Sequence, residues 1–189
     1  MSTSLIIILV AIAVVGLIIM SMYNGLIRKK NEVENAFGGM DVQLKKRYDL
    51  IPNLISTVKQ FMTHEKDLLT KVTELRAKAM SGNVSTEEKV DIDNQITGAM
   101  KGIMVAVESY PDLKSNENFL NLQRTMNEVE SQISAARRAY NASVTDFNNG
   151  VQMFPSSIIA GMMHLQAKKV FEIPEVQREN YDAKSLFDS

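Results

Sequence analysis

SNENFLNLQRTMNEVESQISAARRAYNASVTDFNNGVQMF (115–154) is the stretch that decides the fold class of this chain. Its apolar residues would form a narrow stripe along one face of a helix, which is typical of a helix that packs in a bundle as in a coiled coil. A helix over this stretch would be about 60 Å long, and Pro155 is expected to end it. The apolar residues recur at alternating steps of three and four: Phe119, Leu122, Met126, Val129, Ile133, Ala136, Tyr140, Val144, Phe147, Val151 and Phe154.

Three shorter segments upstream carry the same stripe. They cover residues 33–48, 54–79 and 92–110. Ser85 and Glu88 have the spacing of a capping box, which predicts that the third helix begins just after Ser85. Only 9 Gly and 4 Pro are present, and this scarcity of helix breakers also favours helices. The segments therefore predict a bundle of four helices.

The connection between the first two segments has two interpretations. Pro52 either kinks one continuous helix or lies in the first turn of a new helix capped by Asp49, where its missing N–H costs nothing. A continuous helix would run about 85 Å, too long for the other segments to cover its apolar residues. A hairpin near Tyr48 would give four antiparallel helices of comparable length. We favour the hairpin, although no glycine is present there to form a turn.

The N-terminal stretch LIIILVAIAVVGLIIMSM (5–22) contains no charge. As a helix it would be about 27 Å long, close to the ~30 Å thickness of a bilayer's hydrocarbon core. A cleaved signal peptide fits less well, because no basic residue precedes the apolar run; the other alternative is a buried core helix. Tyr23 lies at the expected interface and is followed by Arg28, Lys29 and Lys30. The positive-inside rule therefore predicts an N-terminus outside and a cytoplasmic domain.

These patterns predict an all-α fold, in which an N-terminal transmembrane helix precedes an antiparallel four-helix bundle with long coiled-coil-like helices. The predicted parts are the anchor (1–23), the bundle (24–155), and a short amphipathic segment with an acidic tail (156–189). Segment 156–170 is either an interfacial amphipathic helix or, as we favour, a short helix folded back onto the bundle. The tail that begins at Phe171 is either flexible or a docking peptide, and the sequence leaves both open.

No pattern of residues indicates a catalytic, cofactor or metal site. The chain has no Cys, and His64 and His164 lie 100 residues apart without metal-ligand spacing. A formal net charge of −1 without a basic patch argues against a nucleic-acid partner. Asp91 and Asp93 are expected to charge a helix N-terminus favourably. We predict that the protein is not an enzyme and has no cofactor or small-molecule substrate.

Polar residues gather in two clusters instead, one near residues 41–53 and one on the long fourth segment. Ion pairs between Asp41 or Asp49 and Arg137 or Arg138 would fix the register of the helices. The alternative is a charged face that binds a partner. The members are Asp41, Arg47, Asp49, Asn53, Arg137, Arg138 and Asn141.

Four stretches resemble the LemA family: YNGLIRKKNEVENAF (23–37), DVQLKKRYDLIPNL (41–54), YPDLKSNENFLNLQ (110–123) and ARRAYNASVTDFNNGVQMFPSSIIAG (136–161). The resemblance covers nearly the whole chain in the right order. It implies a bacterial protein of the cell (inner) membrane with an N-terminal membrane helix and a four-helix bundle, and it implies no defined reaction. Gly38-Gly39 departs from the family, which usually has Trp-Ala there, and allows a close approach of backbones.

The predicted function is that of a single-pass membrane scaffold or interaction protein. Its partners would be the lipid bilayer and a protein. That protein would be either a further copy of the chain, in a homo-oligomer, or another membrane or cytoplasmic protein. Self-association is plausible because an anchor concentrates the copies in two dimensions. The alternative is a protein that organises or remodels membranes through the bundle and segment 156–170.

Overall fold

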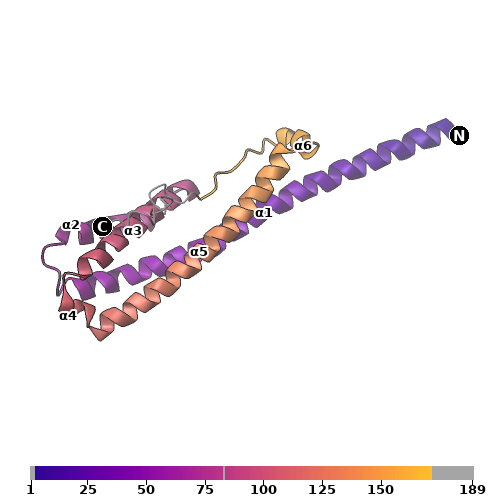
Figure 1. Cartoon of the computed structure of the whole chain (residues 1–189). Helices are drawn as coiled ribbons and strands as arrows, with labels where there is room; N and C mark the ends of the chain where they lie inside the picture. The colour runs from indigo at the N-terminus through magenta and orange to yellow at the C-terminus, as the bar shows by residue number, and fades with distance from the viewer. Residues whose placement is uncertain (1–2, 83, 172–189) are drawn as a thin grey trace, which may run out of the picture.

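The computed structural model describes residues 3–82 and 84–171, and within them every regular element is a helix (Figure 1). The all-helical fold that begins with a long apolar helix is thereby confirmed. The helices are α1 (Thr3–Val58), α2 (Lys66–Ala79), α3 (Thr86–Val107), α4 (Pro111–Lys114), α5 (Glu117–Gln152) and α6 (Ser156–Met162).

Helix α1 is one continuous helix of 56 residues, so the hairpin predicted near Tyr48 is wrong. The helix passes through Pro52, whose missing N–H leaves the carbonyl of Tyr48 without its usual partner four residues on. That carbonyl accepts a hydrogen bond from Nε of Arg76, a residue of α2, at 2.7 Å. A side chain from another helix thus replaces the bond that proline removes.

The turn between the first two bundle helices lies instead at residues 59–65, between α1 and α2. The segment predicted as one helix over 54–79 is therefore split between these two helices. Helices α2 and α3 form a hairpin beside the distal half of α1, and α5 returns along α1 towards the N-terminus (Figure 1). The 36 residues of α5, about 54 Å of helix, cover the apolar face that a continuous helix was predicted to leave uncovered.

The bundle core consists of the predicted stripes. Met40, Leu44, Ile96, Ile133 and Val144 are all fully buried. The stripe of the fourth segment ends earlier than predicted, because α5 stops at Gln152 and Phe154 is 81% exposed.

The helix caps also follow the sequence in part. The hydroxyl of Ser85 accepts a hydrogen bond from the backbone N–H of Glu88 at 3.2 Å and begins α3, as predicted. The carboxylate of Glu88 pairs with Lys78 at 3.2 Å rather than completing the capping box. The side chain of Asn116 caps α5 by accepting from the N–H of Phe119 at 3.1 Å.

Near the N-terminal end of the bundle, α5 and α6 pack against α1 just beyond the apolar stretch. Leu26, Ile159 and Ala160 form a small second core there. Gly150 permits the close approach of α5, because a Cβ at this position would lie 3.2 Å from Leu26 Cδ2. In contrast, a Cβ at Gly38 or Gly39 would meet nothing within 4 Å, so those two glycines permit no close contact here.

The apolar part of α1 projects beyond this second core (Figure 1). Its most apolar 18-residue window has a mean hydropathy of 3.2 and is not buried at all by the rest of the chain. It is long and apolar enough to cross a membrane, and it is not a core helix of this bundle.

Candidate functional site

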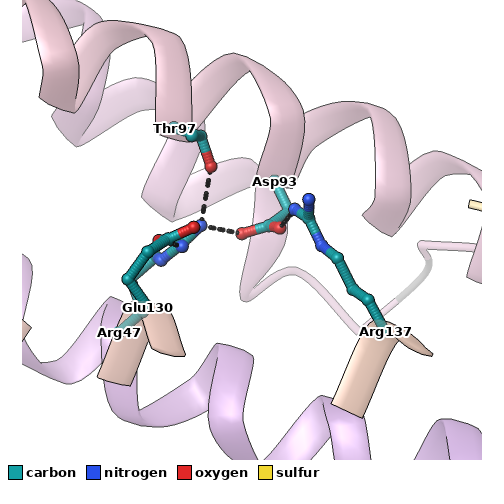
Figure 2. Close-up of polar contacts among 5 residues, drawn as sticks. All are labelled: Arg47, Asp93, Thr97, Glu130 and Arg137. Carbon is teal, nitrogen blue, oxygen red and sulfur yellow. Dashed lines mark hydrogen bonds and ion pairs between the residues drawn. The ribbon is translucent and has the colours of Figure 1, made fainter. Parts of the chain in front are cut away.

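Charged side chains from three helices meet inside the bundle (Figure 2). Arg47 of α1 is 2% exposed and Asp93 of α3 is fully buried. Nη1 of Arg47 donates to Oδ1 of Asp93 at 2.5 Å and to the hydroxyl of Thr97 at 2.9 Å. Glu130 of α5 pairs with Nη2 of Arg47, and Arg137 of α5 pairs with the other carboxylate oxygen of Asp93. Arg47 and Asp93 are buried, whereas Glu130 and Arg137 reach the surface with part of their side chains. We call these five residues the ion cluster; it joins α1, α3 and α5.

The two arginines and two carboxylates of this cluster balance in charge. Burial lowers the pKa of Arg47, and the neighbouring carboxylate of Asp93 opposes that shift. Burial also raises the pKa of the adjacent Tyr48 hydroxyl, and the negative charge of Asp93 adds to the effect. A buried charge is tolerated only when it is paired and hydrogen-bonded, and Asp93 supplies that pairing to both arginines.

The ion pairs differ from those predicted. Asp41 pairs with Lys89 of α3 at 2.7 Å, and Asp49 pairs with Lys45 one turn earlier on the same helix at 2.9 Å. Among the described residues, neither aspartate forms an ion pair with Arg137 or Arg138. The structure brings Arg47 and Arg137 together at Asp93, whereas Asn53 is exposed on α1.

Asp93, Thr97 and Glu130 were missed as members of the cluster. Asp93 was interpreted as a helix N-terminal charge, but it lies on the buried face of α3. One signal was present in the sequence: Asp93 and Thr97 are four residues apart, directly beside Ile92 and Ile96 of the apolar stripe. A polar pair in register with a buried stripe indicates a buried polar contact.

The predicted interface residues lie on α1 just past the apolar stretch. Tyr23 and Arg28 are exposed. Lys29 pairs with Asp146 of α5, and Lys30 lies 3.9 Å from Glu34 one turn later.

After α6 the chain turns back and follows α5 in an extended conformation over residues 165–171 (Figure 1). Two asparagines of α5 hold it through its backbone. The side-chain amide of Asn148 donates to the carbonyl of Lys168 and accepts from its N–H, both at 2.8 Å. Asn141 makes the same pair of bonds with Phe171, at 2.9 and 2.8 Å. Asn141, predicted as part of a polar cluster, therefore binds backbone.

Phe171 anchors the end of this extended segment. Its ring is 6% exposed and meets the ring of Tyr140 edge to face, with centroids 5.0 Å apart. The guanidinium of Arg137 lies 5.8 Å from the same ring. Phe171 thus joins the bundle core.

A groove of about 450 Å³ lies between α3 and α5, and Phe171 is one of its lining residues. Three methionines form its apolar part, and three basic side chains line it. Asn127 and Ser134 of α5 lie along its length. One acidic side chain, Glu130, and Thr97 also belong to the lining. We call it the α3–α5 groove; its lining is Thr97, Met100, Lys101, Met104, Met126, Asn127, Glu130, Ser134, Arg137, Arg138, Asn141 and Phe171.

Both histidines are exposed, and in the described part of the chain no three His, Asp or Glu side chains are grouped in a way that could hold a metal ion. The converging charges that the structure does contain neutralise one another inside the bundle. Their geometry serves to fix the register of three helices.

Comparison with known proteins places this fold in a family. The model of the LemA family matches residues 36–184. The chain is also similar to the protein named Protein LemA of Metamycoplasma hominis, with 26% identity over 163 residues, which are 86% of this chain and 74% of the relative. Because the family match covers most of the bundle and continues beyond it, this chain belongs to the LemA family.

Proposed function

We propose that this protein is a non-enzymatic, single-pass membrane protein whose helical domain associates with further copies of itself at the cytoplasmic surface. The observation that supports this proposal most is the continuity of α1, which runs from the exposed apolar stretch into the bundle core without a break. A helix of this kind would hold the domain rigidly to its anchor. Anchoring raises the effective concentration of the copies and so favours association.

The use of the polar residues supports a binding role over a reaction. Arg47 and Asp93 are paired with each other, and their burial leaves them out of reach of a substrate. Arg137 borders a groove, but its guanidinium is paired with Asp93. The basic residues after the apolar stretch support a cytoplasmic domain by the positive-inside rule.

Crosslinking of the full chain in membranes tests this function. A lysine-reactive crosslinker is expected to produce species at multiples of 21.1 kDa, and two differently tagged copies are expected to co-purify in mild detergent. As a control, residues 5–22 are replaced by an unrelated single-pass span, which keeps the two-dimensional concentration unchanged. Association that survives this replacement is carried by the helical domain. A chain that remains monomeric at every protein-to-lipid ratio would contradict the proposal.

A second candidate function, contact of the domain with the lipid surface, is favoured by the position of α6. This helix packs on Leu26, which lies only about 6 Å beyond Met22 along α1, at headgroup depth. Its exposed side chains are apolar: Phe154 before it is 81% exposed and Met162 at its end 75%, with Met153 and Ile158 also exposed. Apolar side chains at this depth are typical of an interfacial segment.

We expect a fluorescent probe on Phe154→Cys to be quenched by lipids that carry a quencher in the upper acyl chain. The chain has no cysteine of its own, so a single probe labels one site in the full chain reconstituted into nanodiscs. The matched control is Ser109→Cys, an exposed site in the turn between α3 and α4, near the start of α5 and about 50 Å of helix farther from the anchor. Equal and weak quenching at both sites would rule out lipid contact by α6.

A further inference from the structure

We propose that the α3–α5 groove is a binding site for an extended peptide, and that its occupant is the segment EIPEVQR, residues 172–178 of the same chain. These residues lie outside the described part of the chain. The proposal goes beyond the function above and does not depend on it. It would make the acidic tail a docking peptide, one of the two interpretations that the sequence left open.

The first argument is the register of the contacts that the structure already contains. Asn148 and Asn141 are seven residues apart on α5, which is about 10.5 Å along the helix. Their partners, Lys168 and Phe171, are three residues apart, which is about 10 Å of extended chain. The two spacings match, so each heptad of α5 accommodates three residues of an extended peptide that runs antiparallel to it.

The second argument is the continuation of this register into the groove. Ser134 lies seven residues before Asn141 on α5, and Asn127 lies seven residues before Ser134; both line the groove. The residues that would face them are Pro174 and Gln177. Proline has no N–H, so the single donor of a serine hydroxyl suffices for its carbonyl. Gln177 offers an N–H and a carbonyl, which the amide of Asn127 can bind in the way that Asn141 binds Phe171.

The third argument is the length of the groove. Its lining on α5 extends from Asn141 back to Met126, which is about 22 Å of helix. An extended chain covers this distance with six or seven residues, the length of segment 172–178. Asn141, at the end of the groove that is farthest along α5, binds the carbonyl of Phe171, so the proposed segment would begin there.

The fourth argument is chemical complementarity. Lys101 and Arg138 line the groove beside two charges that already have partners, Arg137 with Asp93 and Glu130 with Arg47. The segment contains Glu172 and Glu175 and ends in Arg178, so it carries a net negative charge towards the two cations. The apolar side chains in the segment, Ile173 and Val176, match the three methionines of the groove, which adapt readily to bound side chains. Pro174 also favours an extended conformation for itself and for the residue before it. The family match, which continues to residue 184, includes this segment.

A disulfide in the full chain tests the proposed register. In Asn127→Cys/Gln177→Cys, mild oxidation is expected to form an intramolecular bond about tenfold faster than in two control pairs, because docking holds the two thiols at high effective concentration. The first control, Thr125→Cys/Gln177→Cys, has its helix cysteine on the opposite face of α5. The second, Asn127→Cys/Ser185→Cys, has its tail cysteine beyond the proposed segment. A faster-moving monomer on a non-reducing gel reports the bond.

A pair of charge variants tests the recognition itself. Arg138→Glu, an exposed residue of the groove, is expected to slow the Asn127→Cys/Gln177→Cys bond several-fold, and adding Glu172→Lys is expected to restore the rate. Equal rates in the test pair and both controls would overturn the proposal. A covalent dimer in place of the intramolecular bond would also overturn it, because the occupant would then be the tail of a second copy.

Discussion

Replacing Asp93 by alanine is expected to lower the free energy of unfolding by about 3–5 kcal/mol. Asp93 is fully buried and pairs with both Arg47 and Arg137. Without it, Arg47 remains 2% exposed beside a second positive charge, with Glu130 as its remaining carboxylate partner. Unfolding of the full chain in nanodiscs by guanidinium chloride, followed by circular dichroism, would measure the loss.

Asp91→Ala is the matched control, since Asp91 is an exposed aspartate two residues away on the same helix and is expected to change stability by about 0.5 kcal/mol at most. A second comparison replaces the charges together. Arg47→Met, Asp93→Leu and Arg137→Met in one chain are expected to recover most of the lost stability, because no unpaired charge remains buried. An Asp93→Ala protein as stable as Asp91→Ala would show that the cluster does not hold the helices together.

Two arginines in the apolar stretch, Val14→Arg and Val15→Arg, are expected to remove the protein from the membrane. The stretch contains twelve Leu, Ile and Val residues. Together these favour insertion by about 4–7 kcal/mol, whereas each arginine near the centre of a span opposes it by about 2.5–3.5 kcal/mol. The doubly substituted chain should therefore appear in the supernatant after alkaline carbonate extraction of membranes.

Val42→Arg serves as the control for this experiment. Val42 lies on the same helix and is 55% exposed, but it belongs to the bundle rather than to the apolar stretch. Its substitution should leave the protein in the membrane pellet. A Val14→Arg/Val15→Arg protein that stays in the pellet together with the control would mean that the stretch does not span the membrane.

The core of the bundle was predictable from the sequence because the apolar stripes are regular. The alternation of three and four places Met40, Ile96, Ile133 and Val144 on the inner faces of their helices, and all four are fully buried. The cap at Ser85 was predictable for a similar reason, since its partner is only three residues away.

The path of α1 was not predictable, because the contact that permits it comes from another helix. Pro52 argues for a break on local grounds, and only Arg76, 28 positions along the chain from Tyr48, supplies the hydrogen bond that compensates for it. The ion cluster was missed for the same reason. Arg47 and Arg137 were singled out as polar residues, but their shared partner on α3 depends on how three helices pack.

If the apolar stretch spans a membrane as proposed, the uninterrupted α1 couples the orientation of that span to the position of the far end of the domain. About 54 Å of helix lie between Met22 and Val58. If the span tilts in the bilayer by a further 10°, well within the range that such helices adopt, the turn after Val58 sweeps about 9 Å sideways. A change in bilayer thickness, or a neighbouring protein, that tilts the span would then move the distal turn sideways.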